Sequence, residues 1–195
     1  RLLGYYTLLR FDGELPVEVQ SDLPLLKTNM VALGDQLLKG LHSHPYQTVM
    51  GKSAGDFNWG SNSKAANQSV ALIQIYNLTD HRKYLEGALT NLDYLLGRNA
   101  TGYCFVTGFG MNSPMHPHHR PSEADGIEVP VPGFLVGGPN GQMQDDCTYR
   151  SKLPDEAYTD QTCSYASNEV AINWNAPLAY LLNATESLQR DFTND

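Results

Sequence analysis

Apolar side chains recur at helical spacing through the first half of the chain, and this periodicity restricts the possible folds more than any other feature. It predicts a helix from Leu23 to about Leu41, capped by Asp22. Two further helices are expected over residues 63–76 and 80–96, with Asp80 as the cap of the second. The short turn between them predicts an antiparallel hairpin, and no alternation typical of a strand occurs here. The sequence therefore predicts a mainly α-helical protein.

The pattern changes over residues 100–162, which contain seven of the eleven prolines and many glycines. Irregular segments of this length inside a compact domain usually serve a function. We expect a short strand at residues 104–110, CFVTGFG, and a glycine-rich lobe at residues 129–146 that packs its Phe and Val side chains inward. These long loops are the expected location of a functional site.

Size and charge restrict the class of protein and its partners. With 195 residues, 41% of them hydrophobic, the chain can bury one core and is expected to form one domain. Its net charge of -8 argues against nucleic acid and anionic membranes, because neither would meet a basic surface. No apolar run approaches the roughly 20 residues of a membrane span. The opening RLLGYYTLLR has the pattern of a helix interior, so we expect a longer polypeptide with any targeting segment upstream.

Three cysteines are too few for a disulfide framework, although one pair is possible. Cys147 and Cys163 flank a loop that precedes the most polar helical segment, and a disulfide between them would staple that loop. Buried free thiols are the alternative for this pair.

A polar loop rich in Gly, Ser and Asn, residues 47–68, contains Phe57 and Trp59. An aromatic ring on such a loop can stack on a sugar, while neighbouring amides and hydroxyls bond the sugar hydroxyls. The alternative is that Trp59 closes the end of the hydrophobic core.

The stretch from Tyr158 to Leu178, YTDQTCSYASNEVAINWNAPL, concentrates polar side chains where a packing helix would carry Leu or Ala. We expect a helix start here, with Ser167 and Asn168 as caps and Glu169 in the first turn. The positive end of the helix dipole favours the ionised carboxylate, whereas a general acid must hold its proton. An ordinary helix-stabilising Glu is the alternative interpretation.

A histidine-rich loop, MHPHHR, places His116, His118 and His119 close together. Imidazole is a common zinc ligand, but no Cys or carboxylate sits at ligand spacing. Sugar recognition fits better, because a neutral His and the guanidinium of Arg120 can bond adjacent hydroxyls.

Two separated stretches, GFGMNSPMHPHHR and YTDQTCSYASNEVAINWNA, resemble the signatures of glycoside hydrolase family 9, most of whose members are cellulases. The second stretch matches at every spaced position, namely Tyr158, Asp160, Tyr165, Glu169, Ala171, Asn175 and Ala176. The first matches at Gly110, Asn112, Pro117, His118 and Arg120, with Cys104 where Ser, Thr or Val is usual. The WGSN run at residues 59–62 also resembles a cleft loop of the family, so the resemblance covers nearly the whole chain.

The resemblance implies a role for each matched residue. Glu169 would be the general acid, supported by Asp160. His118 and Arg120 would bind the sugar on the non-reducing side of the cut. The aromatic residues Trp59, Tyr165 and Trp174 would contribute to the cleft, with Trp174 in place of the more frequent Tyr.

The resemblance also implies part of an (α/α)6 barrel of helical hairpins and hydrolysis of β-1,4-glucosidic bonds with inversion. Inversion needs a second carboxyl as base. The family's base motif is absent here, so residues 1–195 are expected to be the C-terminal portion of one catalytic domain, with its N-terminal half as partner and a β-glucan as substrate. No cofactor is expected, a structural calcium ion is possible at Asp145, Asp146, Asp155 and Glu156, and the location is expected to be secreted, extracellular or periplasmic. A non-catalytic carbohydrate-binding module and a histidine-ligated metalloenzyme are the alternatives.

Overall fold

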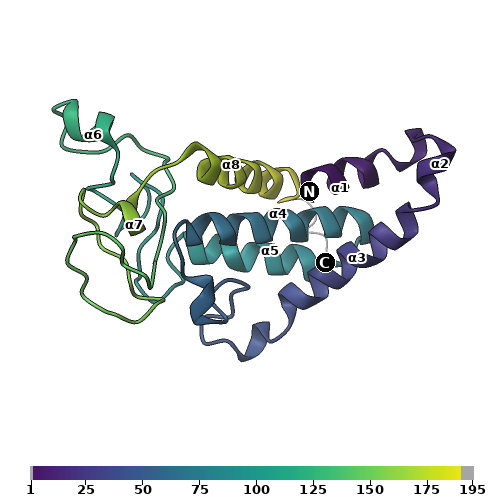
Figure 1. Ribbon diagram of the computed structural model, residues 1–195, viewed down its shortest axis with the longest axis horizontal. Coiled ribbons are helices and arrows are strands. Elements are labelled where there is room, and N and C mark those ends of the chain that lie inside the picture. Colours follow the sequence, from purple (N-terminus) through teal and green to yellow (C-terminus); the bar gives the residue numbers. More distant parts are fainter. Residues whose placement is uncertain (1, 190–195) are drawn as a thin grey trace.

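The computed structural model describes residues 2–189, and these residues form helices joined by long irregular loops (Figure 1). The α-helices are α1 (Leu2–Arg10), α2 (Val17–Gln20), α3 (Leu23–Leu38), α4 (Ser61–Thr79), α5 (Arg82–Leu95), α6 (Arg120–Ala124), α7 (Tyr165–Asn168) and α8 (Ile172–Ser187). Three short 3-10 helices are η1 (Asp12–Glu14), η2 (Leu41–Ser43) and η3 (Ala54–Asp56). The mainly α-helical class predicted from the periodicity is confirmed.

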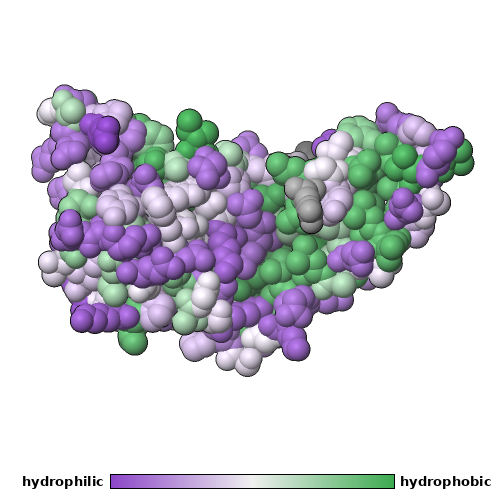
Figure 2. Space-filling view, viewed as in Figure 1, coloured by the Kyte–Doolittle hydropathy of each residue, from purple (hydrophilic) through white to green (hydrophobic). Residues whose placement is uncertain are grey.

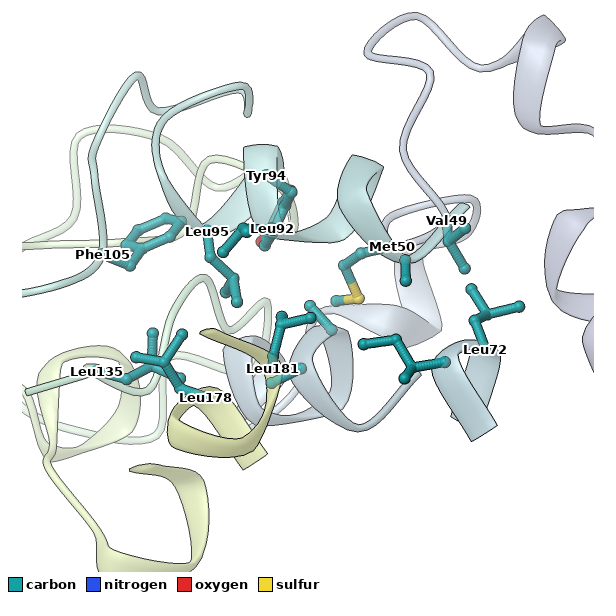
Figure 3. Packing of buried hydrophobic residues seen from close by; sticks show 14 of the residues in the cluster. Val49, Met50, Leu72, Leu92, Tyr94, Leu95, Phe105, Leu135, Leu178 and Leu181 are labelled. Atoms are coloured by element: carbon teal, nitrogen blue, oxygen red, sulfur yellow. The ribbon is translucent and has the colours of Figure 1, made fainter. Parts of the chain in front are cut away.

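The helices pack around α4, which contacts α5, α8, α3 and α1. In Figure 1, α4 and α5 run side by side through the centre, while α1 to α3 form one end of the molecule. The loops with α6 and α7 form the other end. Because α4 has neighbours on several sides, it buries side chains around most of its circumference. Figure 3 shows the core that results, in which Leu92, Leu95, Leu178 and Leu181 lie between α5 and α8, and Leu72 lies further along, near Val49.

Small and hydrogen-bonding side chains bring α4 and α5 together. The hydroxyl of Ser69 donates to the carbonyl of Ala88 at 2.9 Å, and the Asn91 amide donates to the carbonyl of Ala65 at 3.0 Å. A Cβ placed on Gly87 of α5 would lie 2.3 Å from a methyl carbon of Leu38 at the end of α3, and 3.4 Å from a methyl carbon of Leu72 in α4. These contacts leave no room for larger residues at the crossing, which confirms the predicted helical hairpin in close packing.

One predicted helix cap is wrong, and the other is confirmed in position only. Asp80 does not cap α5, because it adopts a left-handed conformation (φ 56°) that ends α4, and His81 precedes α5 instead. Asp22 precedes α3 as expected but makes no side-chain cap hydrogen bond. The C-terminal end of the helix predicted to reach about Leu41 lies earlier in the structure. Helix α3 ends at Leu38, and Gly40 turns the chain with φ 75°.

No strand forms within residues 2–189, so the strand expected at residues 104–110 is absent. Isolated bridges take its place, joining Val106 to Leu135, His118 to Glu169, and Val136 to Val170. The lobe at residues 129–146 packs only partly as expected. Leu135 and Val136 are fully buried, whereas Val129 and Val131 are exposed at 59% and 42%. The loop end is therefore built from bridges and hydrogen bonds rather than from a sheet.

The opposite end of the molecule presents an apolar surface. Figure 2 shows hydrophobic residues gathered over the end that contains α1 to α3, whereas the loop end is mainly hydrophilic. Leu3, Val17 and Leu25 have exposed fractions of 76%, 73% and 66%. A groove of about 550 Å³ lies between α1, α4 and α8, lined in part by Leu3, Phe11 and Pro177. Within the described helices, none has both the length and the apolar character needed to cross a membrane.

Candidate active site

Glu169 lies between two helices rather than in the first turn of one, so the predicted position was wrong. Helix α7 ends at Asn168, Glu169 is extended (φ -71°, ψ 150°), and α8 begins only at Ile172. Its backbone is held on both sides, by the bridge to His118 and by the amide of Gly137, which donates to the Glu169 carbonyl at 2.9 Å. The dipole of a helix starting at Glu169 therefore plays no part in its chemistry.

Trp59 reaches the carboxylate of Glu169 from a segment 110 positions earlier in the chain. Its indole Nε1 donates to Oε2 of Glu169 at 3.0 Å. The ring is 49% exposed and lies 6.0 Å from the ring of Tyr165, measured between centroids. Trp59 therefore does not close the core, and the alternative interpretation of this residue is wrong.

Trp174 is half-buried beneath the loop that carries Trp59. A Cβ on Gly60 would come within 2.9 Å of the Trp174 indole, and one on Gly137 within 3.2 Å. Gly60 also has a φ of 80°, which favours glycine. The indole thus packs against two backbone segments and supports the Trp59 loop from below.

His118 lies beside Glu169 and is fixed in one orientation. Its amide donates to the carbonyl of Asn168 at 2.8 Å, and its Nδ1 lies 2.6 Å from the carbonyl oxygen of Thr162. A carbonyl oxygen can only accept, so Nδ1 must carry a proton, and the tautomer of the neutral ring that fits this bond has Nε2 as an acceptor. The ring centroid is 6.2 Å from that of Tyr165. The imidazole of His118 and the indole of Trp59, which bonds the carboxylate, therefore both lie near the phenol ring of Tyr165.

Arg120 is exposed as the first residue of α6, and among the described residues no hydrogen bond or ion pair joins it to Glu169. The guanidinium of Arg120 is therefore accessible to solvent, two positions after His118 in the chain. It does not bind the Glu169 carboxylate in the described structure.

Asp160 does not contact Glu169 through any hydrogen bond in the described part of the chain. Its two oxygens accept the amides of Met115 at 2.8 Å and His116 at 2.9 Å, and the side-chain amide of Asn168 at 3.0 Å. Asp160 therefore ties the histidine loop to Asn168, the residue that precedes Glu169.

Two positioning residues escaped the sequence analysis. Asn168 was expected to cap a helix, but its side chain is fully buried and bonds Asp160, His116 and Tyr158. Asp145 was considered only as a calcium ligand. No local sequence signal identifies either role, because the contacts depend on how the irregular loop segments fold back on one another.

Asp145 organises the start of α7. Its Oδ2 accepts the hydroxyl of Ser164 at 2.8 Å, the amide of Ala166 at 3.0 Å and the hydroxyl of Tyr149 at 2.9 Å. Since these donors already occupy the carboxylate, Asp145 does not fit the role of a calcium ligand. Across residues 2–189, no group of three or more His, Cys, Asp and Glu side chains could hold a metal ion, so the described structure offers no support for the histidine-ligated metalloenzyme.

Cys147 and Cys163 form a disulfide with their Cα atoms 5.8 Å apart, and Cys104 is a buried free thiol. The bridge holds the segment with Asp145 next to the start of α7. The sequence alone left this pairing open, and the structure decides it in favour of the staple.

Tyr158 supplies a donor that keeps its proton. Its buried hydroxyl donates to Oδ1 of Asn168 at 2.7 Å. Burial, followed by the charge of Asp160 and the neighbouring Tyr103, raises the pKa of Tyr158 well above its ordinary value of 10.0. The hydroxyl therefore remains a hydrogen-bond donor throughout the neutral range.

Together these contacts present a carboxyl group with one bonded oxygen on a surface of aromatic rings and a fixed imidazole. Such an arrangement can hold a sugar by stacking and by hydroxyl bonds while the carboxyl exchanges a proton.

Comparison with known proteins gives consistent matches along the whole chain. The model of glycosyl hydrolase family 9 matches residues 4–182. The chain is 46% identical over 187 residues to a xyloglucan-specific endo-beta-1,4-glucanase of Bacteroides ovatus, covering 95% of this chain and 32% of that protein. It is 34% identical over 182 residues to endoglucanase D of Acetivibrio thermocellus, covering 92% of this chain and 26% of endoglucanase D. The chain thus spans between about a quarter and a third of the length of these relatives.

Solved structures agree with the sequence comparison. A Bacteroides ovatus GH9 structure superposes with a TM-score of 0.88 at 45% identity, covering 96% of this chain and 32% of that one. A single mutant of a thermostable endoglucanase from Alicyclobacillus acidocaldarius gives 0.83 at 36% identity, covering 94% and 35%. These neighbours are (α/α)6 barrel enzymes, which confirms the predicted fold class. Because the family model covers most of the chain and the relatives agree with it, the chain belongs to glycosyl hydrolase family 9.

Proposed function

We propose that this chain supplies the general acid of an enzyme that hydrolyses β-1,4-glucosidic bonds in a β-glucan with inversion. Family membership supports hydrolysis of a glycosidic bond, and the names of the relatives support a β-1,4-glucan backbone, either cellulose-like or xyloglucan. The net charge of -8 suits a neutral polysaccharide.

The observation that carries the proposal is the hydrogen bond from Trp59 to Glu169. With Oε2 accepting the indole at 3.0 Å, Oε1 is the oxygen left to carry a proton, since no other hydrogen bond to Glu169 side-chain oxygens occurs within residues 2–189. A carboxyl with one fixed oxygen and one available oxygen can deliver its proton in a single direction. Glu169 would protonate the glycosidic oxygen through Oε1.

Substrate binding would use the groups around this carboxyl. The exposed ring of Trp59 and the partly exposed ring of Tyr165 offer faces for stacking on glucose units. Nε2 of His118 and the guanidinium of Arg120 offer an acceptor and donors for adjacent hydroxyls. Trp174 would contribute from beneath by holding the Trp59 loop in place.

The base that activates water would come from outside this chain. In inverting enzymes the two carboxyls lie about 6.5 to 9.5 Å apart. Asp160 is occupied by three donors, so it is a poor candidate for the base. We therefore propose that residues 1–195 are the C-terminal portion of one catalytic domain and that its N-terminal half is the partner.

The apolar end of the molecule supports that partner. Exposed Leu3 and Val17 and the groove between α1, α4 and α8 are surfaces that single domains rarely leave in water. Two carboxyls suffice for the reaction, so the proposal includes no cofactor. The disulfide between Cys147 and Cys163 supports a secreted, extracellular or periplasmic location, because disulfides persist in oxidising compartments.

Replacing the acid tests the proposal. In the catalytic domain that contains this chain, Glu169→Gln is expected to lower kcat on β-glucan about 100-fold or more, because the amide cannot donate the proton. Binding of the oligosaccharide should survive. Glu186→Gln, an exposed substitution on α8, is the matched control and should leave kcat unchanged.

Unchanged turnover in Glu169→Gln would defeat the assignment of the acid. Binding without turnover in the unmodified protein would instead favour a carbohydrate-binding module. Assays with both xyloglucan and a cellulose-type oligosaccharide would show whether the enzyme prefers a substituted or an unsubstituted β-1,4-glucan.

A further inference from the structure

We propose that Asn168 is the positioning residue that holds Glu169 and His118 in register, by acting as the common partner of the histidine loop and the acid. The inference rests on the proposed function, and it assigns a role to a residue outside the spaced positions of the two signatures. Asn168 itself does not touch the reacting carboxyl.

The buried side chain of Asn168 has a defined partner for each of its polar groups. Its Nδ2 donates to the carbonyl of His116 at 2.7 Å and to Oδ1 of Asp160 at 3.0 Å. Its Oδ1 accepts the hydroxyl of Tyr158 at 2.7 Å. Both Nδ2 hydrogens and the carbonyl oxygen are therefore used, in a side chain with no exposed surface.

The orientation of the amide is determined by its neighbours. His116 and Asp160 present only oxygens to Nδ2, whereas Tyr158 presents a hydroxyl whose raised pKa keeps it protonated. A flipped amide would place its oxygen against the His116 carbonyl and the Asp160 carboxylate, with no proton between them. A carboxylate in place of the amide would do the same. The site therefore selects an amide over an acid of the same shape.

The backbone of Asn168 connects this side chain to both active groups. Its carbonyl accepts the amide of His118 at 2.8 Å, and the next residue along the chain is Glu169. Asp160 completes the connection by accepting the amides of Met115 and His116. A displacement of Asn168 thus moves the imidazole and the carboxyl relative to each other.

Comparison of Asn168→Asp with Asn168→Ala, in the catalytic domain that contains this chain, provides the test. At neutral pH the introduced carboxylate faces two oxygens, and kcat/KM on β-glucan should fall on the order of 10- to 100-fold because the acid is misplaced. Lowering the pH toward about 5 protonates that carboxyl and restores one donor, so the loss relative to the unsubstituted protein should shrink.

Asn168→Ala has no proton to gain, so its activity should remain a constant fraction of that of the unsubstituted protein across the same pH range. Asn183→Asp, an exposed substitution on α8, should show the unsubstituted pH profile. A wild-type kcat/KM in Asn168→Asp would overturn the inference. So would equal, pH-independent losses in both Asn168 variants, which would indicate a packing role alone.

Hydrogen exchange at the amides of Met115 and His116 gives a readout that does not depend on turnover. Loss of the anchor should speed their exchange about tenfold or more in Asn168→Asp, and unchanged rates would contradict the inference. If that variant does not fold, Tyr158→Phe removes only the hydroxyl and should give a smaller change in the same direction, on the order of fivefold. An unsubstituted protein that leaves β-glucans intact would defeat the proposed function, while the exchange rates would still decide the role of Asn168.

Discussion

The helical end and the loop end of the molecule differ in the balance between apolar packing and hydrogen bonding. Around α4 and α5 the core consists of apolar side chains packed against small residues, as at Leu72 opposite Gly87. In the loop end, asparagines bond backbone groups that belong to no sheet. Asn175 exchanges two hydrogen bonds with the backbone of Leu135, and Asn140 holds the carbonyl of Ala166. Apolar packing determines how whole helices fit together, whereas a hydrogen bond determines the orientation of the two groups that form it.

This difference separates stability from geometry. Substitution of a buried apolar residue in the helical end should lower the free energy of unfolding and leave the site geometry intact. Substitution of a polar residue in the loop end should disturb the site more than the stability. The variants of Glu169 and Asn168 test the expectation for polar residues of the loop end. Three further variants test the helical end, the disulfide and the junction between the two ends.

The largest stability effect is expected from Leu72→Ala in α4. Leu72 is fully buried, and its loss should lower the free energy of unfolding by about 2–5 kcal/mol through lost burial and a residual cavity. KM and kcat should stay within twofold of their original values. Denaturant titration measures the loss, with Leu153→Ala, exposed at 58%, as the near-neutral control. A large change in kcat at unchanged stability would break the comparison.

A smaller effect is expected from removing the disulfide in the loop end. The double substitution Cys147→Ser with Cys163→Ser opens a loop closed across 16 positions and should cost about 3 kcal/mol. Because Asp145 lies near the bridge and organises the start of α7, activity should fall as well. Thermal unfolding and kcat are measured on the same preparation, and Cys104→Ser serves as a thiol control. Full activity in the double variant would show that hydrogen bonds alone hold α7.

The smallest effect concerns the ion pair between Asp56 and Lys64 at the junction of the two ends. Burial raises the pKa of Asp56, but bonds from Lys64 at 2.6 Å and from Ser53 outweigh it and lower the pKa below 3.8. A lowered folded pKa stabilises the protein above the unfolded value and loses that contribution as the pH falls through the folded value. The loss should appear below about pH 4 and stay under about 1 kcal/mol, because Lys64 is partly exposed.

Unfolding titrations between pH 5 and pH 3 measure this contribution. Asp56→Asn should remove it and flatten the profile relative to the original protein. An identical pH dependence in both proteins would mean that other carboxyls account for acid sensitivity in this range.

The helical end was predictable because its determinants are local. The apolar spacing identified the hairpin of α4 and α5, although the boundary at Asp80 was missed because an Asp can also adopt the left-handed conformation that ends a helix. The position of Glu169 was wrong for a different reason. Residues 165–188 have the pattern of one helix, and only distant partners, His118 and Gly137, hold Glu169 extended between α7 and α8.

The spacing of the two signatures predicted Glu169 and His118 as site residues. It contained no information on Asn168 or Asp145. Their importance arises from where the chain returns in space. The disulfide between Cys147 and Cys163 was left open for the same reason, because spacing permits a bridge without requiring it.

The bond between Trp59 and Glu169 also has a consequence for the order of folding. Its partners are 110 positions apart, with the α4 and α5 hairpin and most of the long loops between them. Contacts at such separation carry a high loop-closure cost until the intervening chain is compact. The contacts of the helical hairpin are close in sequence, so the hairpin can form early and lower the loop-closure cost of the bond between Trp59 and Glu169. We expect the carboxyl of Glu169 to acquire its neighbours in one of the last folding steps, after most of the native surface has been buried.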